Sequence, residues 1–92
     1  MKNFDDLVDC PDEELQILIR MLTPSTLAMA LKTASREVVV KFFVNMSRGA
    51  EGLIEDMMEK LQNPTADEIA MERKKILEFY HGLKSEGKLS GR

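Results

Sequence analysis

The chain has 92 residues, of which 43% are hydrophobic and 32% are charged, and its net charge is -3. This length provides for one folded domain with a single modest core and excludes a second domain, and the composition is not that of a disordered chain. A negative net charge without a cluster of Lys and Arg excludes the usual nucleic-acid-binding classes, because phosphate contacts depend on such clusters.

No segment of the sequence is suited to crossing a membrane. The most apolar stretch, residues 38–46, is interrupted by Lys41 and Asn45 and is much shorter than the ~20 residues that a spanning helix needs. The N-terminus lacks the apolar core of a signal peptide. The one cysteine, Cys10, cannot form an internal disulfide, which suits a reducing compartment. We therefore expect a cytoplasmic protein without direct membrane insertion.

Prolines and hydroxyl side chains mark the starts of the predicted helices. Pro11, Pro24 and Pro64 are expected in first helical turns, where the missing N–H of proline is not needed. Ser35 and Ser47 are expected N-caps, whose hydroxyls accept hydrogen bonds from free backbone N–H groups. These signals predict helices over residues 4–8, 12–22, 25–33, 37–46, 48–61 and 66–85.

The Val- and Phe-rich segment at residues 38–44 has strand propensity, but it lacks a period-two pattern and lies between helix caps. We therefore predict a buried helix there. Helices joined by short connections must turn back on their neighbours. The sequence thus predicts an all-α protein, a compact armadillo-like superhelical stack of about five to six helices, forming a single domain over residues 1–92.

The clearest helical periodicity lies in residues 48–61. Apolar side chains at three- and four-residue spacing form one stripe, which consists of Ala50, Leu53, Ile54, Met57, Met58 and Leu61. The charged residues fall on the remaining face, and they are Arg48, Glu51, Glu55, Asp56, Glu59 and Lys60. This face is either a solvated outer surface, with Asp56 and Lys60 paired one turn apart, or an electrostatic docking ridge.

The last predicted helix carries signals at both ends. Thr65 and Glu68 have the spacing of a capping box, and Gly87 is expected to end the helix in a left-handed conformation. Residues 86–92 are expected to form a flexible tail. The buried side of this helix is expected to consist of Ile69, Ile76, Leu77, Tyr80 and Leu83.

Catalytic chemistry has little support in this sequence. The chain has one histidine, His81, and one cysteine, and it has no Gly-rich phosphate loop. Acidic residues near the N-terminus do not follow a calcium-loop pattern, and those at residues 12–14 are explained by the favourable helix dipole. We expect no enzyme, no catalytic residue, no cofactor and no metal.

Two short motifs carry a resemblance to a known family. Residues 27–35 read LAMALKTAS and residues 45–50 read NMSRGA; both resemble signatures of the flagellar motor switch protein FliG. The stretch FDDLVDCPDEELQILIRML at residues 4–22 looks like the opening of that family's C-terminal domain, and ILEFYHGLKSEGKL at residues 76–89 looks like its last helix. The resemblance covers nearly the whole chain.

The resemblance implies a function in the flagellar rotor. It implies an all-helical domain of the switch complex, or C-ring, that transmits torque by presenting a charged helix to the cytoplasmic loop of a MotA-type stator subunit. The implied partners also include FliM, the FliG middle domain and neighbouring FliG copies. The implied location is the cytoplasmic face of the inner membrane in the flagellar basal body.

The family's charged residues are only partly matched. The resemblance assigns stator binding to Lys32 and Asp56, with Arg48 as a substitute for an arginine whose own position holds Gly49. Two further charged positions hold Met57 and Thr65. The additional interaction face would consist of Glu51, Glu55, Glu59 and Lys60.

Residues 1–10 resemble the family's hinge segment followed by a short helix. Met1 and Phe4 match its hinge motif, in which Lys2 replaces an aromatic residue. The depleted charges leave an alternative open: a stand-alone FliG-like interaction or regulatory module that no longer contacts the stator.

Overall fold

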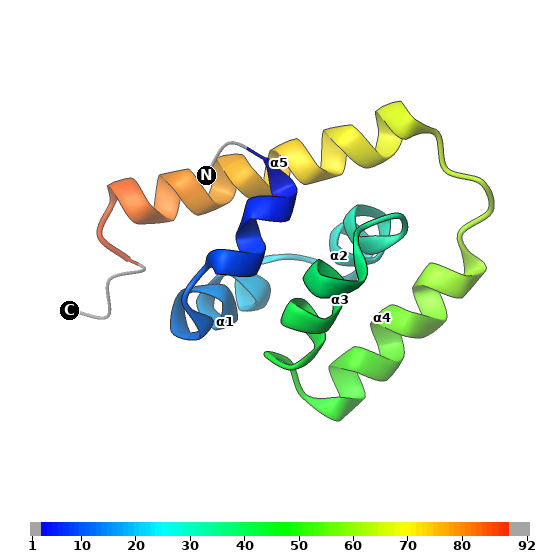
Figure 1. The fold of residues 1–92 in the computed structure, drawn as a ribbon, viewed down its shortest axis with the longest axis horizontal. Coiled ribbons are helices and arrows are strands. Elements are labelled where there is room, and N and C mark those ends of the chain that lie inside the picture. Colours follow the sequence, from blue (N-terminus) through cyan, green and yellow to red (C-terminus); the bar gives the residue numbers. More distant parts are fainter. Residues whose placement is uncertain (1–2, 89–92) are drawn as a thin grey trace.

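The computed structural model describes residues 3–88, which form six helices and no strand (Figure 1). All six predicted helices are present. The short first helix is a 3₁₀ helix, and the other five are α-helices. Their bounds are η1 Phe4–Asp9, α1 Asp12–Met21, α2 Pro24–Leu31, α3 Arg36–Phe43, α4 Arg48–Lys60 and α5 Ala66–Ser85. The prediction of an all-α stack is therefore confirmed.

Hydroxyl caps begin four of these helices. The side-chain oxygens of Thr23, Ser35, Ser47 and Thr65 accept hydrogen bonds from backbone N–H groups in the first turns of α2, α3, α4 and α5. Thr65 also forms the predicted capping box, because the Glu68 carboxylate accepts from the Thr65 N–H at 2.8 Å. The predicted caps at Ser35, Ser47 and Thr65 are confirmed.

The proline positions were predicted less well. Pro24 is the first residue of α2, as expected, whereas Pro11 is the extended residue just before α1 and Pro64 precedes the cap Thr65. The prediction of first-turn positions is wrong for Pro11 and Pro64. Pro11 has φ of -56° and ψ of 141°, so the fixed φ of proline fits this position before the helix as well as it fits a first turn.

Helices α1 and α4 end one residue earlier than predicted, and α2 and α3 end two and three residues earlier, at Leu31 and Phe43. After Phe43 the N–H groups of Asn45 and Met46 bond to carbonyls three residues back, so the chain continues in tighter turns that the residue pattern does not distinguish from α-helix.

The C-terminal end of α5 follows the prediction at Gly87. This residue has a φ of 75°, and the Lys88 N–H donates to the Leu83 carbonyl at 2.9 Å. This pairing satisfies a carbonyl that the end of the helix leaves free. Residues 86–88 of the predicted tail thus form an ordered helix-ending turn, and residues 89–92 of that prediction lie outside the described residues.

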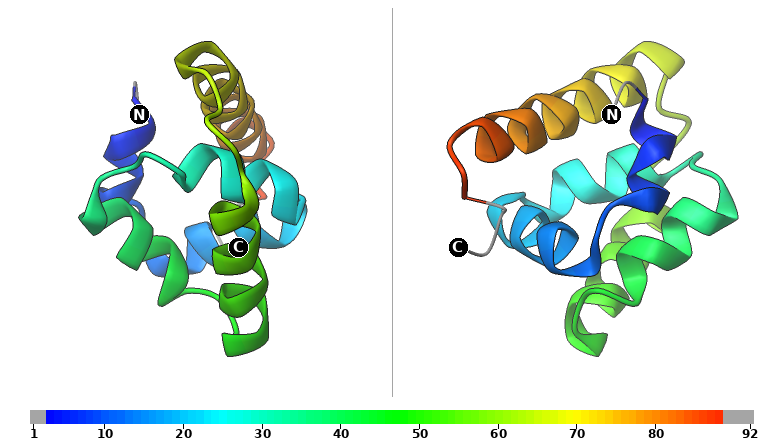
Figure 2. Two further views of the ribbon diagram at one scale, coloured as in Figure 1. Left: turned by 90° about the vertical axis from the view of Figure 1, so that its right-hand side faces the viewer. Right: turned by 60° about the vertical axis from the view of Figure 1, so that its left-hand side comes forward.

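Helix α2 lies at the centre of the packing, between α4 on one side and α5 on the other (Figures 1 and 2). Helix η1 packs against α3 and α5. All six helices contribute to one core, whose members include Leu7, Leu15, Leu18, Leu31, Phe42, Ile54 and Ile76. No helix within residues 3–88 combines the length and apolar character needed to span a bilayer.

The predicted buried side of α5 is largely correct. Ile69, Ile76, Tyr80 and Leu83 are buried, and Leu77 is half-buried.

Candidate protein-binding site on helix α4

Helix α4 is attached to the domain along one narrow side. It packs mainly on α2, and Ile54 is the only fully buried residue within Arg48–Lys60. Leu53, which was predicted to belong to the buried stripe, is 50% exposed. Because α2 covers only part of the predicted stripe, most of the surface of α4 remains open to a partner.

A row of carboxylates follows this open surface. Glu51, Glu55 and Glu59 recur every four residues, so they lie on one side of the helix. Asp56 lies beside Glu55. None of these four carboxylates takes part in an ion pair within residues 3–88. The pair predicted between Asp56 and Lys60 is likewise not formed there, because both side chains are exposed and an isolated surface pair gains little.

Lys32 holds the C-terminal end of α4. It directly follows α2, and its Nζ donates to the backbone carbonyl of Met58 at 2.6 Å. A cation is favourable there, because the last carbonyls of a helix carry the negative end of its dipole. The structure therefore brings Lys32 and the charged helix together, but the Lys32 ammonium is already bonded to the backbone of α4.

Arg48 lies at the opposite end of this helix. It is the first residue of α4 and is exposed, whereas Lys32 contacts Met58 in the last turn. At a rise of 1.5 Å per residue, these two ends are roughly 15 Å apart. The three predicted stator-binding residues Lys32, Arg48 and Asp56 therefore do not form one compact cluster.

A groove opens between α3 and α4, beside the carboxylate row. It has a volume of about 290 Å³, and its lining residues are Lys32, Val39, Phe43, Glu55, Met58 and Glu59. The side chains of Val39, Phe43 and Met58 are half-buried, and those of Glu55 and Glu59 are exposed. The groove thus combines an apolar floor with an acidic rim.

Phe4, from the predicted hinge, is fixed in the core. It is 5% exposed, its ring stacks on that of Phe42 with centroids 5.6 Å apart, and the Arg73 guanidinium lies 5.1 Å from its centroid. Met1, the other predicted hinge residue, lies outside the described residues. Hinge motion at Phe4 itself would require breaking these contacts.

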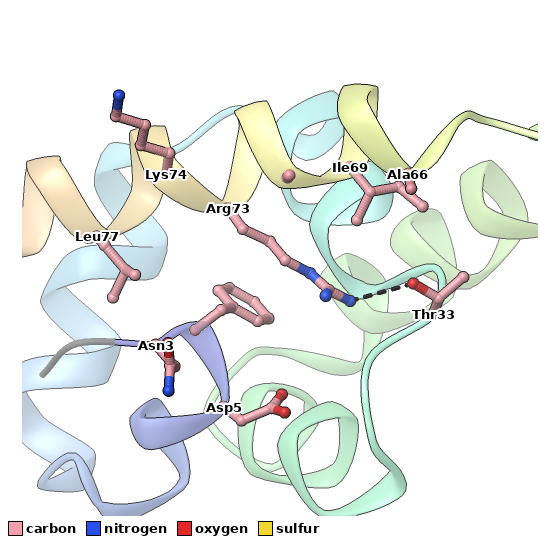
Figure 3. Close-up of a pocket in the computed structure, with 10 residues that line it drawn as sticks. Asn3, Asp5, Thr33, Ala66, Ile69, Arg73, Lys74 and Leu77 are labelled. Atoms are coloured by element: carbon pink, nitrogen blue, oxygen red, sulfur yellow. Dashed lines mark hydrogen bonds between the residues drawn. The ribbon is translucent and has the colours of Figure 1, made fainter.

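Arg73 joins three parts of the fold (Figure 3). Besides covering Phe4, it donates from Nε to the Ala30 carbonyl at 2.9 Å and from Nη2 to Thr33 Oγ1 at 3.3 Å. Sequence reasoning missed this residue. The available signal was its position between Ile69 and Ile76 on the buried side of α5, where a charged residue needs hydrogen-bond partners.

A second polar cluster ties α1 to α5. The Glu14 carboxylate accepts hydrogen bonds from Tyr80 Oη at 2.9 Å and Lys84 Nζ at 3.0 Å. Burial acts to raise the pKa of Glu14, but the bonds from Lys84 and Tyr80 outweigh it and the pKa is lowered. Burial, with the nearby Glu14 charge, raises the pKa of the Cys10 thiol. Near neutral pH the Glu14 carboxyl is therefore ionised and the Cys10 thiol is protonated. These protonation states suit a structural role in joining α1 to α5, and a protonated thiol is a poor nucleophile.

Metal coordination finds no support in the described part of the chain. Within residues 3–88, no three or more His, Cys, Asp or Glu side chains come together in a way that could hold an ion.

The helical stack defines the class of the protein as an all-α domain, with helix α4 largely exposed on its surface. The family model described as the FliG C-terminal domain matches residues 1–90. The chain belongs to this FliG C-terminal domain family, and the resemblance seen in its two motifs is confirmed. The full-length relatives are named flagellar motor switch proteins, so the chain belongs to a motor-switch family and not to a family named for an enzymatic activity.

Relatives and solved structures agree with this family. The chain is 30% identical over 86 residues to the flagellar motor switch protein FliG of Thermotoga maritima, covering 94% of this chain and 26% of that protein. It is 31% identical over 84 residues to FliG of Pseudomonas aeruginosa, covering 91% and 25%. A crystal structure of FliG from Helicobacter pylori superposes with a TM-score of 0.85 at 27% identity, covering 96% of this chain and 39% of that one. The chain thus spans about a quarter of the length of these two relatives.

Proposed function

We propose that this domain transmits torque in the flagellar rotor by binding the cytoplasmic loop of a MotA-type stator subunit through α4. The observation that carries the proposal is the row Glu51, Glu55 and Glu59 with Asp56, which has no ion pair within residues 3–88. Like charges one turn apart destabilise a helix slightly, and a basic partner surface would relieve that repulsion and be steered toward it.

The domain would act at the cytoplasmic face of the inner membrane, in the basal body. Its other surfaces would contact FliM, the FliG middle domain and neighbouring FliG copies. Because Phe4 contacts Phe42 and Arg73, a hinge motion at Phe4 relative to the middle domain would have to break these contacts.

The alternative is a stand-alone FliG-like interaction or regulatory module without stator contact. It is favoured by what occupies two of the depleted charge positions. Thr65 caps α5 through its hydroxyl, and Met57 is partly buried against the core. These positions serve the fold of this chain, and neither side chain supplies the charge that the family pattern places there.

Charge reversal in the cell tests the stator proposal. Asp56→Lys should slow swimming, and a compensating acidic substitution in the basic part of the stator loop should restore it. The matched control is Glu78→Lys, which makes the same charge change at an exposed position of α5. Rotation of tethered cells measures the effect. Motility that ignores Asp56→Lys and the stator change alike would rule out torque transfer through α4 and leave the stand-alone module.

Binding in solution provides a second test. A pull-down of this domain with the stator loop should succeed at low salt and weaken at high salt, because exposed charges are screened. Binding that is indifferent to salt would contradict an electrostatic contact.

A further inference from the structure

Two apolar grooves meet at Val44, the residue that follows α3. Val40 and Val44 are 48% and 70% exposed. The first groove lies between η1 and α3, has a volume of about 430 Å³, and its apolar lining is Val8, Val40 and Val44. The second lies between α1 and the start of α4, has a volume of about 550 Å³, and its apolar lining is Ile19, Val44, Met46 and Ala50. Because both grooves include Val44, they form one accessible apolar surface, which we call the Val44 surface.

The ridge between the two grooves is held in place by its neighbour Asn45. The Asn45 side chain donates from Nδ2 to Asp12 Oδ1 at 3.1 Å and to the Lys41 carbonyl at 2.8 Å. Its Oδ1 accepts from Gln16 Nε2 at 2.9 Å. These bonds tie the end of α3 to α1, so the exposure of Val44 belongs to a fixed backbone. A site that is formed in advance avoids the ordering cost that weakens binding.

The rim of the Val44 surface carries more positive than negative charge. The charged residues that line the two grooves are Arg20, Arg36, Glu37 and Lys41. Lys41 is already paired with Asp12 at 2.7 Å. Arg20 and Arg36 are exposed, and neither forms an ion pair among residues 3–88. Arg36 lies at the start of α3, roughly 12 Å along the helix from Val44, whereas Arg20 lines the groove on the other side of Val44.

We propose that the Val44 surface binds an amphipathic helix of a partner protein, with an apolar face and carboxylates beside it. Side chains three or four residues apart project from the same side of such a helix, so they enter the two grooves on either side of Val44. The carboxylates pair with Arg20 and Arg36, whose guanidinium groups match carboxylate geometry. An amphipathic helix laid into an apolar groove is a common mode of protein recognition, and the flexible side chain of Met46 adapts to what it receives.

Other occupants fit the Val44 surface less well. A basic helix is repelled by Arg20 and Arg36, and a partner without charge leaves these arginines unpaired while displacing their water. A lipid surface touches protruding side chains and leaves the grooves unfilled. The Val44 surface lies apart from the carboxylate row of α4 and has the opposite charge, so the proposal goes beyond the stator contact and stands independently of it.

Peptides of defined composition test the proposal on the intact chain. The probe is a helical peptide of alanine and glutamine with leucines at positions i, i+4 and i+7 and a glutamate on either side of them. One matched peptide has lysine in place of glutamate, and another has alanine in place of leucine. Titration followed by NMR should shift the signals of Val8, Val40 and Val44. The glutamate peptide should bind at least about fivefold tighter than the lysine peptide and at least about tenfold tighter than the alanine peptide.

Substitutions separate the apolar contact from nonspecific stickiness. Val44→Ser should weaken binding of the glutamate peptide at least about fivefold, because Val44 lies between the two occupied grooves. The matched control is Met71→Ser on α5, where Met71 is 61% exposed, and it should leave the affinity unchanged.

Two double variants separate the arginine contacts from the overall charge. Arg20→Gln with Arg36→Gln should abolish the preference for the glutamate peptide over the lysine peptide. Lys74→Gln with Lys75→Gln removes the same charge from exposed positions of α5 and should keep that preference. Circular dichroism of each variant confirms that the helices are intact.

Three results would overturn the proposal: equal affinity for the glutamate and lysine peptides, equal weakening by Val44→Ser and Met71→Ser, or shifts confined to another face. Vesicles of phosphatidylcholine and phosphatidylglycerol test a lipid surface, and sedimentation of the chain alone tests a second copy. Vesicle binding or self-association that is lost in Val44→Ser would assign the surface to that occupant and overturn the acidic helix. The stator proposal is tested separately, by motility with Asp56→Lys.

Discussion

Truncation of Ile54 should detach α4 from the rest of the domain. This side chain is 2% exposed and is the only fully buried one in Arg48–Lys60. Ile54→Ala removes three carbon atoms and leaves a cavity against α2, and buried substitutions of this kind cost about 2–5 kcal/mol. A domain of this size has a total unfolding free energy of roughly 5–14 kcal/mol. The expected loss is therefore a large part of the stability, equivalent to a fall in melting temperature of at least roughly 8 °C.

The neighbouring Leu53 provides the matched control. It belongs to the same helix and loses as many carbon atoms on substitution by alanine, but it is 50% exposed. Leu53→Ala should therefore cost less than about 1 kcal/mol. Urea unfolding measures both variants, and amide hydrogen exchange shows whether α4 opens first. Equal costs for the two variants would refute the reasoning that one buried side chain anchors α4.

Three further predictions concern the ends and ties of the helices. The pKa of Glu14 in the folded chain lies below its ordinary value of 4.5, so its stabilising effect is present above about pH 4.5 and is lost as the pH falls through the folded-state pKa. Glu14→Gln, which weakens the contacts with Tyr80 and Lys84, should flatten this acid dependence in urea unfolding; an unchanged slope would contradict it. Thr65→Ala removes the cap of α5 and should cost about 1 kcal/mol in thermal unfolding, whereas Thr65→Ser should be nearly neutral. Gly87→Ala places a Cβ on a backbone with φ of 75°, although the space around it is open. This left-handed conformation should lower the free energy of unfolding by about 1 kcal/mol. A melting temperature unchanged from the parent would show that the turn relaxes.

The number and order of the helices could be predicted because their signals are local. Ser35, Ser47 and Thr65 each supply a hydroxyl to the turn that follows, and such caps depend on nearby residues only. The end of helix α3 was less predictable. In residues 44–46, Val44 is 70% exposed and the Asn45 side chain donates to Asp12 Oδ1 at 3.1 Å. A contact so distant in sequence leaves no periodic signal.

The candidate site was predictable in composition but not in arrangement. The four-residue spacing of Glu51, Glu55 and Glu59 places them on one helix side from sequence alone. The groove beside them depends on how far α3 diverges from α4, which is set by the packing of both helices on others. The burial of Ile54 next to the exposed Leu53 is likewise decided by the position of α2, since both side chains fit the same apolar stripe.

Lys32 shows why a charged residue in a binding region is not by itself a partner contact. Its Nζ bonds to the Met58 carbonyl at 2.6 Å, so Lys32→Met removes both a surface charge and a bond that stabilises the last turn of α4. A loss of partner binding in that variant would follow from either change, because displacing α4 also displaces Glu55 and Glu59. The two carboxylates make no hydrogen bond or ion pair within residues 3–88, so we expect their removal to leave the position of the helix unchanged. Binding measured with Glu55 and Glu59 variants therefore reports on the partner contact itself, whereas the effect of Lys32 can be assigned only after hydrogen exchange shows that α4 remains folded.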